Sequence, residues 1–285
     1  MEKALGREHS ITLATLHNLA ATLRGLGRYD EAEQLDRRGL AGWEKTVGKV
    51  HVDTLRAISN LASTLHPQDK YAESEQLHRR ALGGIEKALG MEHPDTLTGA
   101  GNLSVTLHAR GKYAESEQLD RRVLDGHEKV FGREHPATLA SVHNLAGSLQ
   151  SQFKFADAER LYRRALDGNE KVLGTEHPST ILIVHSLAYL YHQQKRYDAA
   201  SKLYQSAYDG YVKALGPSHP ATIHCSNIFQ KKNWKKREVI SKRKATAVPA
   251  LEESTMRLSN ARTSVDMVLL CDNVSISLLV RIMAH

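Results

Sequence analysis

The sequence predicts an all-α protein in which helical hairpins stack side by side into a solenoid. Two residue types recur every 42 positions, and a fixed period of this size indicates stacked copies of one supersecondary unit. They are Gly6, Gly48, Gly90, Gly132, Gly174 and Gly216, and three residues later His9, His51, His93, His135, His177 and His219. Aromatic residues make up only 6% of the chain, so leucine and alanine carry the packing, which suits helices.

One unit, residues 90–131, indicates how each hairpin forms. A first helix begins at Pro94, where the missing proline N–H is no loss, and Gly111 ends it. A second helix then runs to about Phe131, and Gly132 supplies its C-terminal stop. Two helices fill the period, which excludes a three-helix armadillo unit. No alternating β-branched residues support a propeller blade, whereas two-helix HEAT units remain open on period alone.

The chain divides in order into a short start, five full units, a partial unit and a tail. Residues 1–5 match the end of a second helix, so we interpret them as the end of a truncated preceding unit and the sequence as a fragment of a longer array. The full units are 6–47, 48–89, 90–131, 132–173 and 174–215, the partial sixth is 216–229, and the tail, expected to be disordered, is 230–285.

A local motif stands in register within these units. In the third unit, Leu103 is followed by the small residue Ser104, the aromatic Tyr113 comes nine residues later, and the small residue Ser116 three further on. The other aromatics at this register are Tyr29, Tyr71, Phe155 and Tyr197. This pattern resembles the tetratricopeptide repeat (TPR) in the 42-residue form of kinesin light chains. The phrase at residues 166–178, LDGNEKVLGTEHP, resembles the TPR arrays of NLR-like nucleotide-binding proteins.

The resemblance covers residues 2–229 and implies both a fold and a function. It implies a right-handed superhelix whose first helices line a concave groove that holds a peptide or protein partner. The parent would be a kinesin light chain-like protein or an NLR-like sensor. Positions that are basic in kinesin-type grooves are mostly histidine, glutamine or small residues here, so a preference for acidic peptides is not expected.

Two further registers bear on packing. Glycine recurs inside the second helices at Gly42, Gly84, Gly126, Gly168 and Gly210. Glycine costs about 1 kcal/mol relative to alanine inside a helix, so this register predicts a crowded backbone contact, with duplication of a tolerated surface residue as the alternative. The aromatic that TPRs usually place four residues after the second-helix alanine is present as Tyr162 and Tyr204. Asp36, His78 and Asp120 replace it in the first three units, where we predict looser packing.

The predicted partner-binding residues lie on one face of the first helices. Successive residues of a helix are 100° apart, which places Asn18 away from the apolar face of Leu16, Ala20 and Leu23. The ladder of amides is Asn18, Asn60, Asn102 and Asn144. Such a ladder can pair with the N–H and C=O groups of an extended peptide, and the resemblance to kinesin light chains points to the same positions. The alternative is that each amide ties an adjacent unit.

Histidines accompany this ladder. His17, His143 and His185 precede the amide register by one residue, and His66, His108 and His192 lie further along the same helices. We interpret them as solvated surface side chains, with a pH-sensitive groove as the alternative. The repeat spreads the histidines, so we expect no metal site and no cofactor. No phosphate-binding glycine loop, G-x-S-x-G motif or Cys/His nucleophile pair is present, so we expect no enzymatic activity.

The formal net charge of +7 is localised. Residues 231–244 carry +7, whereas the repeats carry only +1. An alternative function is therefore a regulatory or adaptor subunit that docks on nucleic acid or an acidic membrane through Lys231–Lys244. A third is self-association through the uncovered first helix.

Several features favour a cytoplasmic protein. Only two cysteines, Cys225 and Cys271, are present, which suggests a reducing compartment. We expect no signal peptide, because Glu2, Lys3 and Arg7 interrupt any apolar run at the start of the sequence. The apolar stretch 265–284 is interrupted by Asp266, Asp272 and Arg281, so no transmembrane segment is expected.

Overall fold

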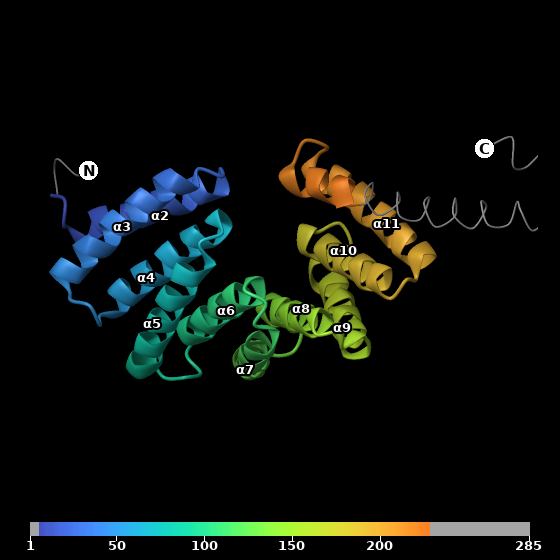
Figure 1. Ribbon diagram of the computed structural model, residues 1–285, viewed down its shortest axis with the longest axis horizontal. Helices are drawn as coiled ribbons and strands as arrows, with labels where there is room; N and C mark the ends of the chain where they lie inside the picture. Colours follow the sequence, from blue (N-terminus) through green and yellow to red (C-terminus); the bar gives the residue numbers. More distant parts are fainter. Residues whose placement is uncertain (1–5, 229–285) are drawn as a thin grey trace, which may run out of the picture. The chain divides into compact units, whose positions relative to one another are not determined.

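The computed structural model describes residues 6–228, and every element in this range is helical (Figure 1). The chain divides after Phe229 into two units, and the described residues all lie in the first. The predicted start of the array at residues 1–5, the basic cluster, the predicted disordered tail and Cys271 lie outside the described residues.

Ten α-helices pair into five hairpins along the described chain (Figure 1). The first helices are α2 (Ser10–Gly25), α4 (Val52–Leu65), α6 (Pro94–Ala109), α8 (Pro136–Ser151) and α10 (Pro178–Gln193). The second helices are α3 (Tyr29–Thr46), α5 (Tyr71–Leu89), α7 (Tyr113–Phe131), α9 (Phe155–Leu173) and α11 (Tyr197–Leu215). A short 3₁₀ turn, η1 (His66–Gln68), follows α4, and a sixth first helix begins at Pro220.

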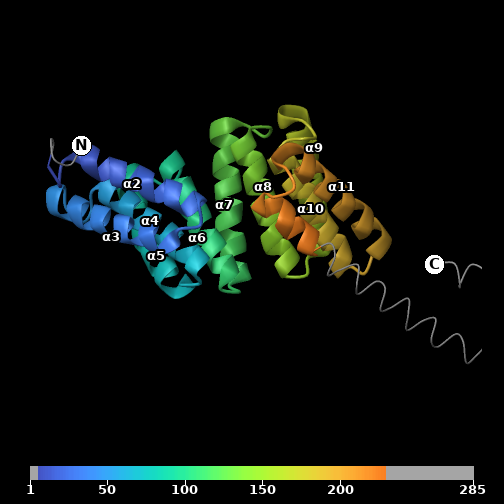
Figure 2. The ribbon, with the colours of Figure 1, turned by 90° about the horizontal axis from the view of Figure 1, so that it is seen from above.

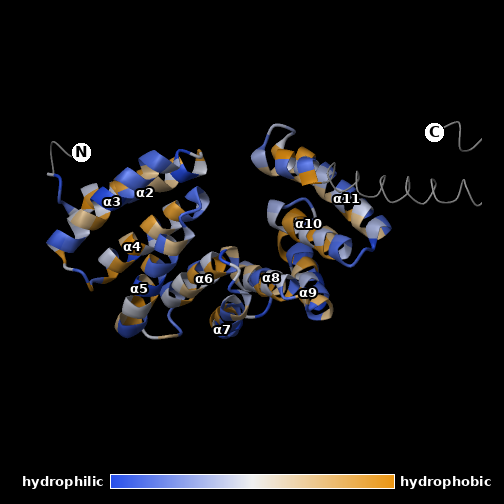
Figure 3. Ribbon diagram, in the orientation of Figure 1, coloured by the Kyte–Doolittle hydropathy of each residue, from blue (hydrophilic) through white to orange (hydrophobic). Residues whose placement is uncertain are grey.

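Each helix packs mainly on the helix before it and the helix after it. For example, α7 contacts both α6 and α8, and lies between them in Figure 2. Every helix carries both hydrophilic and hydrophobic residues (Figure 3), because one side meets its neighbours and the other does not. The described residues therefore form the all-α solenoid that the repeat predicts, and the core is a seam that runs from hairpin to hairpin.

The recurring histidines cap the first helices. Each accepts, through Nδ1, a hydrogen bond from the backbone N–H two residues further on, at 3.1–3.2 Å. The recurring glycine three residues earlier has φ between +86° and +92°, in the left-handed region that glycine adopts without strain. A threonine six residues after each glycine donates its hydroxyl to that glycine's carbonyl, as Thr96 does to Gly90 at 2.6 Å. The capping role of histidine was not predicted from the sequence, although the threonine follows the same 42-residue period.

The glycines inside the second helices confirm the predicted crowded contact. A Cβ atom built on Gly84 would lie 2.5 and 2.7 Å from the two methyl groups of Leu55, which belongs to the first helix of the same hairpin. The same relation holds for Gly42 with Leu13, Gly126 with Leu97 and Gly168 with Leu139, with nearest approaches of 2.4–2.6 Å. Gly210 is less crowded, because Ile181 approaches to 3.1 Å. The glycine register therefore lets the two helices of a hairpin approach closely.

A largely buried glutamate on each of α3, α5, α7 and α9 ties its hairpin to the next. Glu75 on α5 pairs with Arg79 on its own helix and with Arg110 and Lys112 at the turn of the next hairpin. Glu33, Glu117 and Glu159 stand at the same register, and each pairs with an arginine four residues later and with a lysine or arginine of the next hairpin. Burial alone would raise the pKa of Glu75, but hydrogen bonds from Lys112, Arg79 and Arg110 outweigh it and lower the pKa to about 2. The pKa values of Glu33 and Glu117 fall to about 2 through the same balance.

The helices of residues 6–228 include none that combines the length and the apolar character needed to span a membrane.

Candidate partner-binding site

The four asparagines of the ladder stand at one register of α2, α4, α6 and α8. The side chains of Asn18 and Asn144 are exposed, and those of Asn60 and Asn102 are half-buried. Asn60 Nδ2 lies 3.4 Å from His17 Nε2 in the preceding hairpin, so this amide ties adjacent units. The amides of Asn18 and Asn102 make no hydrogen bond to another described side chain. Asn60 therefore ties adjacent units, whereas the amides of Asn18 and Asn102 are left available to pair with a peptide backbone.

The histidines beside the ladder take part in bonds between hairpins. His143 Nε2 lies 2.9 Å from Ser186 Oγ, and His108 Nε2 lies 2.7 Å from Ser151 Oγ, each 43 residues further along the chain. His17 contacts Asn60 with the same spacing. The ring of His185 packs against Tyr204, with 5.4 Å between ring centroids.

The prediction that these histidines are solvated surface side chains is therefore wrong for His17, His108 and His143. Burial lowers the pKa of each. For His17 the charge of Arg24 adds to this effect and that of Asp36 opposes it. Their imidazoles are neutral near pH 7, which suits their contacts with hydroxyl and amide groups across the seam.

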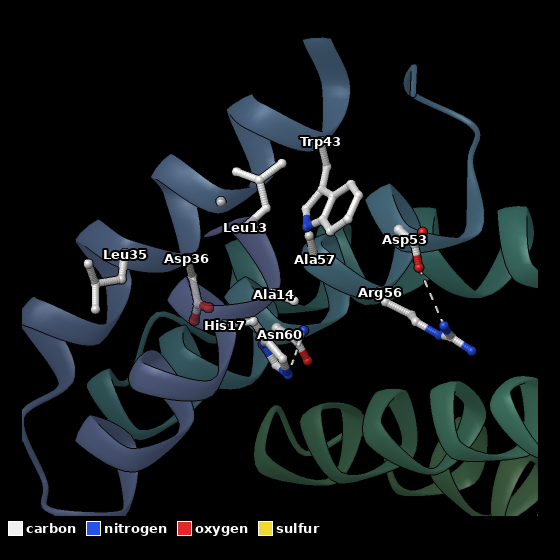
Figure 4. A pocket seen from close by; sticks show the side chains of 11 residues that line it. Leu13, Ala14, His17, Leu35, Asp36, Trp43, Asp53, Arg56, Ala57 and Asn60 are labelled. Atoms are coloured by element: carbon white, nitrogen blue, oxygen red, sulfur yellow. Dashed lines mark hydrogen bonds and ion pairs between the residues drawn. The ribbon is translucent and has the colours of Figure 1, made fainter. Parts of the chain in front are cut away.

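Two pockets each take in two of the seven predicted site residues, whereas Asn18, Asn102 and His185 line neither pocket. The Asp36 pocket, of about 200 Å³, lies between the first and second hairpins, and its lining includes His17, Asp36, Trp43 and Asn60. Figure 4 shows the side chains of His17, Asp36 and Asn60 close together at one end, with Trp43 above them. Asp36 and Trp43 come from the second helix α3, whereas His17 and Asn60 come from the first helices α2 and α4.

The Asp120 pocket, of about 150 Å³, lies between the third and fourth hairpins. Its lining includes His108 and Asp120 from the third hairpin and His143, Asn144 and Ser148 from α8 of the fourth. Two predicted residues, His143 and Asn144, therefore border the same cavity. The sequence did not predict this cavity, because a pocket between hairpins depends on side-chain volumes on three helices.

Both pockets lie beside the register where an aromatic was expected. Asp36, His78 and Asp120 are 4%, 2% and 3% exposed, so they take the buried place of Tyr162 and Tyr204. Asp36 bonds Arg24 and Thr64, and Asp120 bonds Ser104 and Ser148, so hydrogen bonds replace ring packing there. Burial raises the pKa of both carboxyl groups, and these hydrogen bonds oppose the rise. Burial also lowers the pKa of His78 to about 4. Looser packing of the first three units stays a prediction.

Nothing in residues 6–228 gathers three or more histidine, cysteine, aspartate or glutamate side chains as a metal ion would require. The thiol of Cys225 is buried, and burial raises its pKa to about 11. It is therefore protonated and unreactive near neutral pH.

A superhelical stack of hairpins with small residues buried at each crossing defines an α-solenoid repeat protein. Tetratricopeptide repeat family models match residues 12–53, 53–129, 95–171 and 138–213. The chain belongs to the tetratricopeptide repeat family.

Solved structures agree with this assignment. A putative kinesin light chain from Podospora anserina with nearly identical TPR-like repeats is 27% identical, with a TM-score of 0.60 over 71% of this chain and 96% of that one. BtubC (BKLC) from P. vanneervenii is 18% identical, with a TM-score of 0.60 over 74% of this chain and 83% of that one. A Rap protein complexed with competence and sporulation factor is 12% identical, with a TM-score of 0.59 over 84% of this chain and 69% of that one. The last two show the fold alone. No match was found among the curated proteins.

Proposed function

We propose that this chain is a non-enzymatic protein-interaction scaffold that holds an extended segment of a partner protein along its first helices. The observation that carries the proposal is the asparagine ladder, with the amides of Asn18 and Asn102 left unused by internal packing and that of Asn144 exposed. An amide offers both donors and an acceptor, so a row of amides suits the backbone of an extended peptide.

The chemistry around the ladder supports recognition of a peptide backbone. We define the first-helix face by the registers of His17, Asn18 and Ala21. In the five described hairpins these registers hold His17, Asn18 and Ala21; Ser59, Asn60 and Ser63; Gly101, Asn102 and Val105; His143, Asn144 and Gly147; and His185, Ser186 and Tyr189. None of these residues is acidic, lysine or arginine, and buried histidines such as His143 stay neutral near pH 7. A strongly charged partner therefore finds little complementary charge along this face.

The similarity to the Podospora anserina protein favours a kinesin light chain-like scaffold over an NLR-like sensor as the parent of this array. Under either parent the array would act by holding a partner in a cytoplasmic complex, with no cofactor of its own.

Replacing the ladder should weaken binding about tenfold or more. Peptides of 15 residues would be selected from a random library on the full chain. Their Kd would then be measured on the variant that combines Asn18→Ala, Asn60→Ala, Asn102→Ala and Asn144→Ala. Several hydrogen bonds to the peptide backbone are lost, each contributing about 0.5–1.5 kcal/mol. Circular dichroism would confirm that the variant stays helical, since Asn60 also bonds His17.

A matched control is available on the second helices. Gln34, Gln76 and Gln118 are exposed amides that follow the same 42-residue period. Their combined replacement by alanine should leave the Kd unchanged, and an equal loss in both variants would contradict the proposal. Deleting residues 230–285 tests the alternative in which Lys231–Lys244 dock on nucleic acid or an acidic membrane. The proposed function requires that the selected peptides still bind this deletion variant.

A further inference from the structure

The Asp120 pocket holds a carboxylate that has no counter-ion among residues 6–228. Asp120 is 3% exposed, and its oxygens accept hydrogen bonds from hydroxyl groups, with Ser104 on Oδ1 and Ser148 on Oδ2. A buried charge is costly unless an opposite charge or several strong donors accompany it. The site therefore offers more acceptor capacity than its own hairpins use.

The two histidines that border the pocket do not supply the missing positive charge. His108 Nε2 is engaged with Ser151, and burial lowers the pKa of His108 despite the nearby charge of Asp120. His143 is engaged with Ser186, and burial lowers its pKa too. Both rings are therefore neutral near pH 7.

Two hairpins earlier, an arginine of the chain itself occupies the equivalent place, which is separate from the Asp36 pocket because Arg24 does not line that pocket. Arg24 stands two repeats before His108, and its Nη1 lies 3.3 Å from Asp36 Oδ2. The same nitrogen lies 3.0 Å from Thr64 Oγ1 and 3.2 Å from the main-chain carbonyl oxygen of Asn60.

Each of these three acceptors has a counterpart two repeats later. Asp36 corresponds to Asp120, Thr64 to Ser148, and the Asn60 carbonyl to the Asn144 carbonyl. The hydroxyl-to-carboxylate bond is also repeated, since Thr64 and Ser148 each donate to the acid of the preceding hairpin. The arginine alone is missing, because His108 stands at its register, and the cavity of about 150 Å³ lies among these groups.

In the second, fourth and fifth hairpins, a histidine or tyrosine side chain of the chain itself stands in place of the acid. His78 Nδ1 lies 3.5 Å from Ser59 Oγ in the second hairpin, and the hydroxyl of Tyr162 donates to Gln150 Oε1 at 2.8 Å in the fourth. Tyr204 is 1% exposed in the fifth. Among the five described copies, the third alone has an acid at this register without an arginine to match it.

We propose that the Asp120 pocket binds the guanidinium group of an arginine side chain from the extended partner, with Asp120, the Ser148 hydroxyl and the Asn144 carbonyl as acceptors. The proposal rests on the proposed function and adds the chemistry of one partner residue, because the pocket lies beside Asn144 on the first-helix face. A planar guanidinium presents several donors in one fixed fork, which suits three acceptors held in one place.

The probe is Nα-acetyl-arginine amide, titrated into the ¹⁵N-labelled full chain, with Nα-acetyl-citrulline amide as the neutral control of nearly the same shape. The arginine probe should shift the amide signals of Gly147 and Ser148 and bind about tenfold or more tightly than the citrulline probe, because bonds between charged groups are the stronger ones. Asp120→Asn should weaken the arginine probe by a similar factor. Asp36→Asn is the matched control and should not weaken the arginine probe, because Arg24 already pairs with Asp36.

A second variant tests the proposal even if Asp120→Asn fails to fold. His108→Arg places an arginine at the register of Arg24, so it should fill the pocket from within, abolish probe binding and raise the urea midpoint of unfolding. The proposal is overturned if the citrulline probe binds as tightly as the arginine probe, or if His108→Arg leaves probe binding unchanged. These outcomes do not depend on whether the asparagine-to-alanine variant loses affinity for selected peptides. The arginine probe can shift Gly147 and Ser148 even if the asparagine variant keeps its affinity for selected peptides.

Discussion

Gly84→Ala should lower the free energy of unfolding by about 2 kcal/mol, although alanine is the better helix former. A new methyl group at Gly84 would lie 2.5 and 2.7 Å from the two methyl groups of Leu55 and 3.2 Å from its Cγ. Leu55 is 3% exposed, so rotation of its side chain has little free space. Overpacking of this kind costs about 1–3 kcal/mol, and it outweighs the gain in helix propensity. Urea denaturation of the full chain, followed by circular dichroism, measures the effect.

The neighbouring residue supplies the control for this prediction. Gly83 lies on the same helix, and a Cβ atom placed on it would meet nothing within 4 Å. Gly83→Ala should therefore stabilise the chain by up to about 1 kcal/mol, through helix propensity alone. Equal effects at Gly83 and Gly84 would show that the glycine register reflects duplication of a tolerated residue instead of a close helix contact.

Acid should remove a large part of the stability of the array between about pH 5 and pH 2, because three glutamates lose their ion pairs in this range. The pKa values of Glu33, Glu75 and Glu117 are lowered to about 2 in the folded chain, against about 4.3 in an unfolded chain. Because the folded-state pKa is the lower one, the stabilisation is complete above about pH 5 and is lost as pH falls toward 2. With allowance for partial solvent screening, each glutamate contributes about 1–2 kcal/mol. The urea midpoint should therefore fall steeply between pH 5 and pH 2.

A single substitution separates these glutamates from general acid effects. Glu75→Gln should lower the urea midpoint at pH 7, and the difference from the unsubstituted chain should shrink toward zero near pH 2. Glu134→Gln is the control, because Glu134 is exposed and its nearest cation, Lys171, lies 3.9 Å away. A deficit of Glu75→Gln that stays constant from pH 7 to pH 2 would contradict the assigned role.

The sequence predicted the hairpins and their order because both depend on short-range signals. The turn at Gly111, the proline that begins α6 and the glycine that ends α7 act within a few residues of themselves, and the structure confirms each of them. The close approach at Gly84 was also predictable, because glycine inside a helix lowers helix stability, and its recurrence at a fixed register indicates a close contact that excludes a larger side chain. The capping bond of His93 was not predicted, because histidine is an unusual capping residue.

The sequence positions of the candidate site residues were predictable, whereas their burial and their contacts between hairpins were not. The helix period places Asn18 on an outward face, but the contact of Asn60 with His17 depends on how the next hairpin packs. The burial of Asp120 depends in the same way on hydroxyl groups of Ser104 and Ser148, which belong to two different hairpins. Sequence position alone does not report such contacts between units.

Site-specific photo-cross-linking to a selected peptide would show directly whether the partner lies along the first helices. A benzophenone amino acid would replace Val105 on the first-helix face or Gln118 on the outer side of α7, both of which are exposed. A partner held along the first helices should give cross-linked peptide from position 105 and none from position 118. Cross-linking from position 118 with none from position 105 would contradict the proposed function, because the partner would then lie along the second helices.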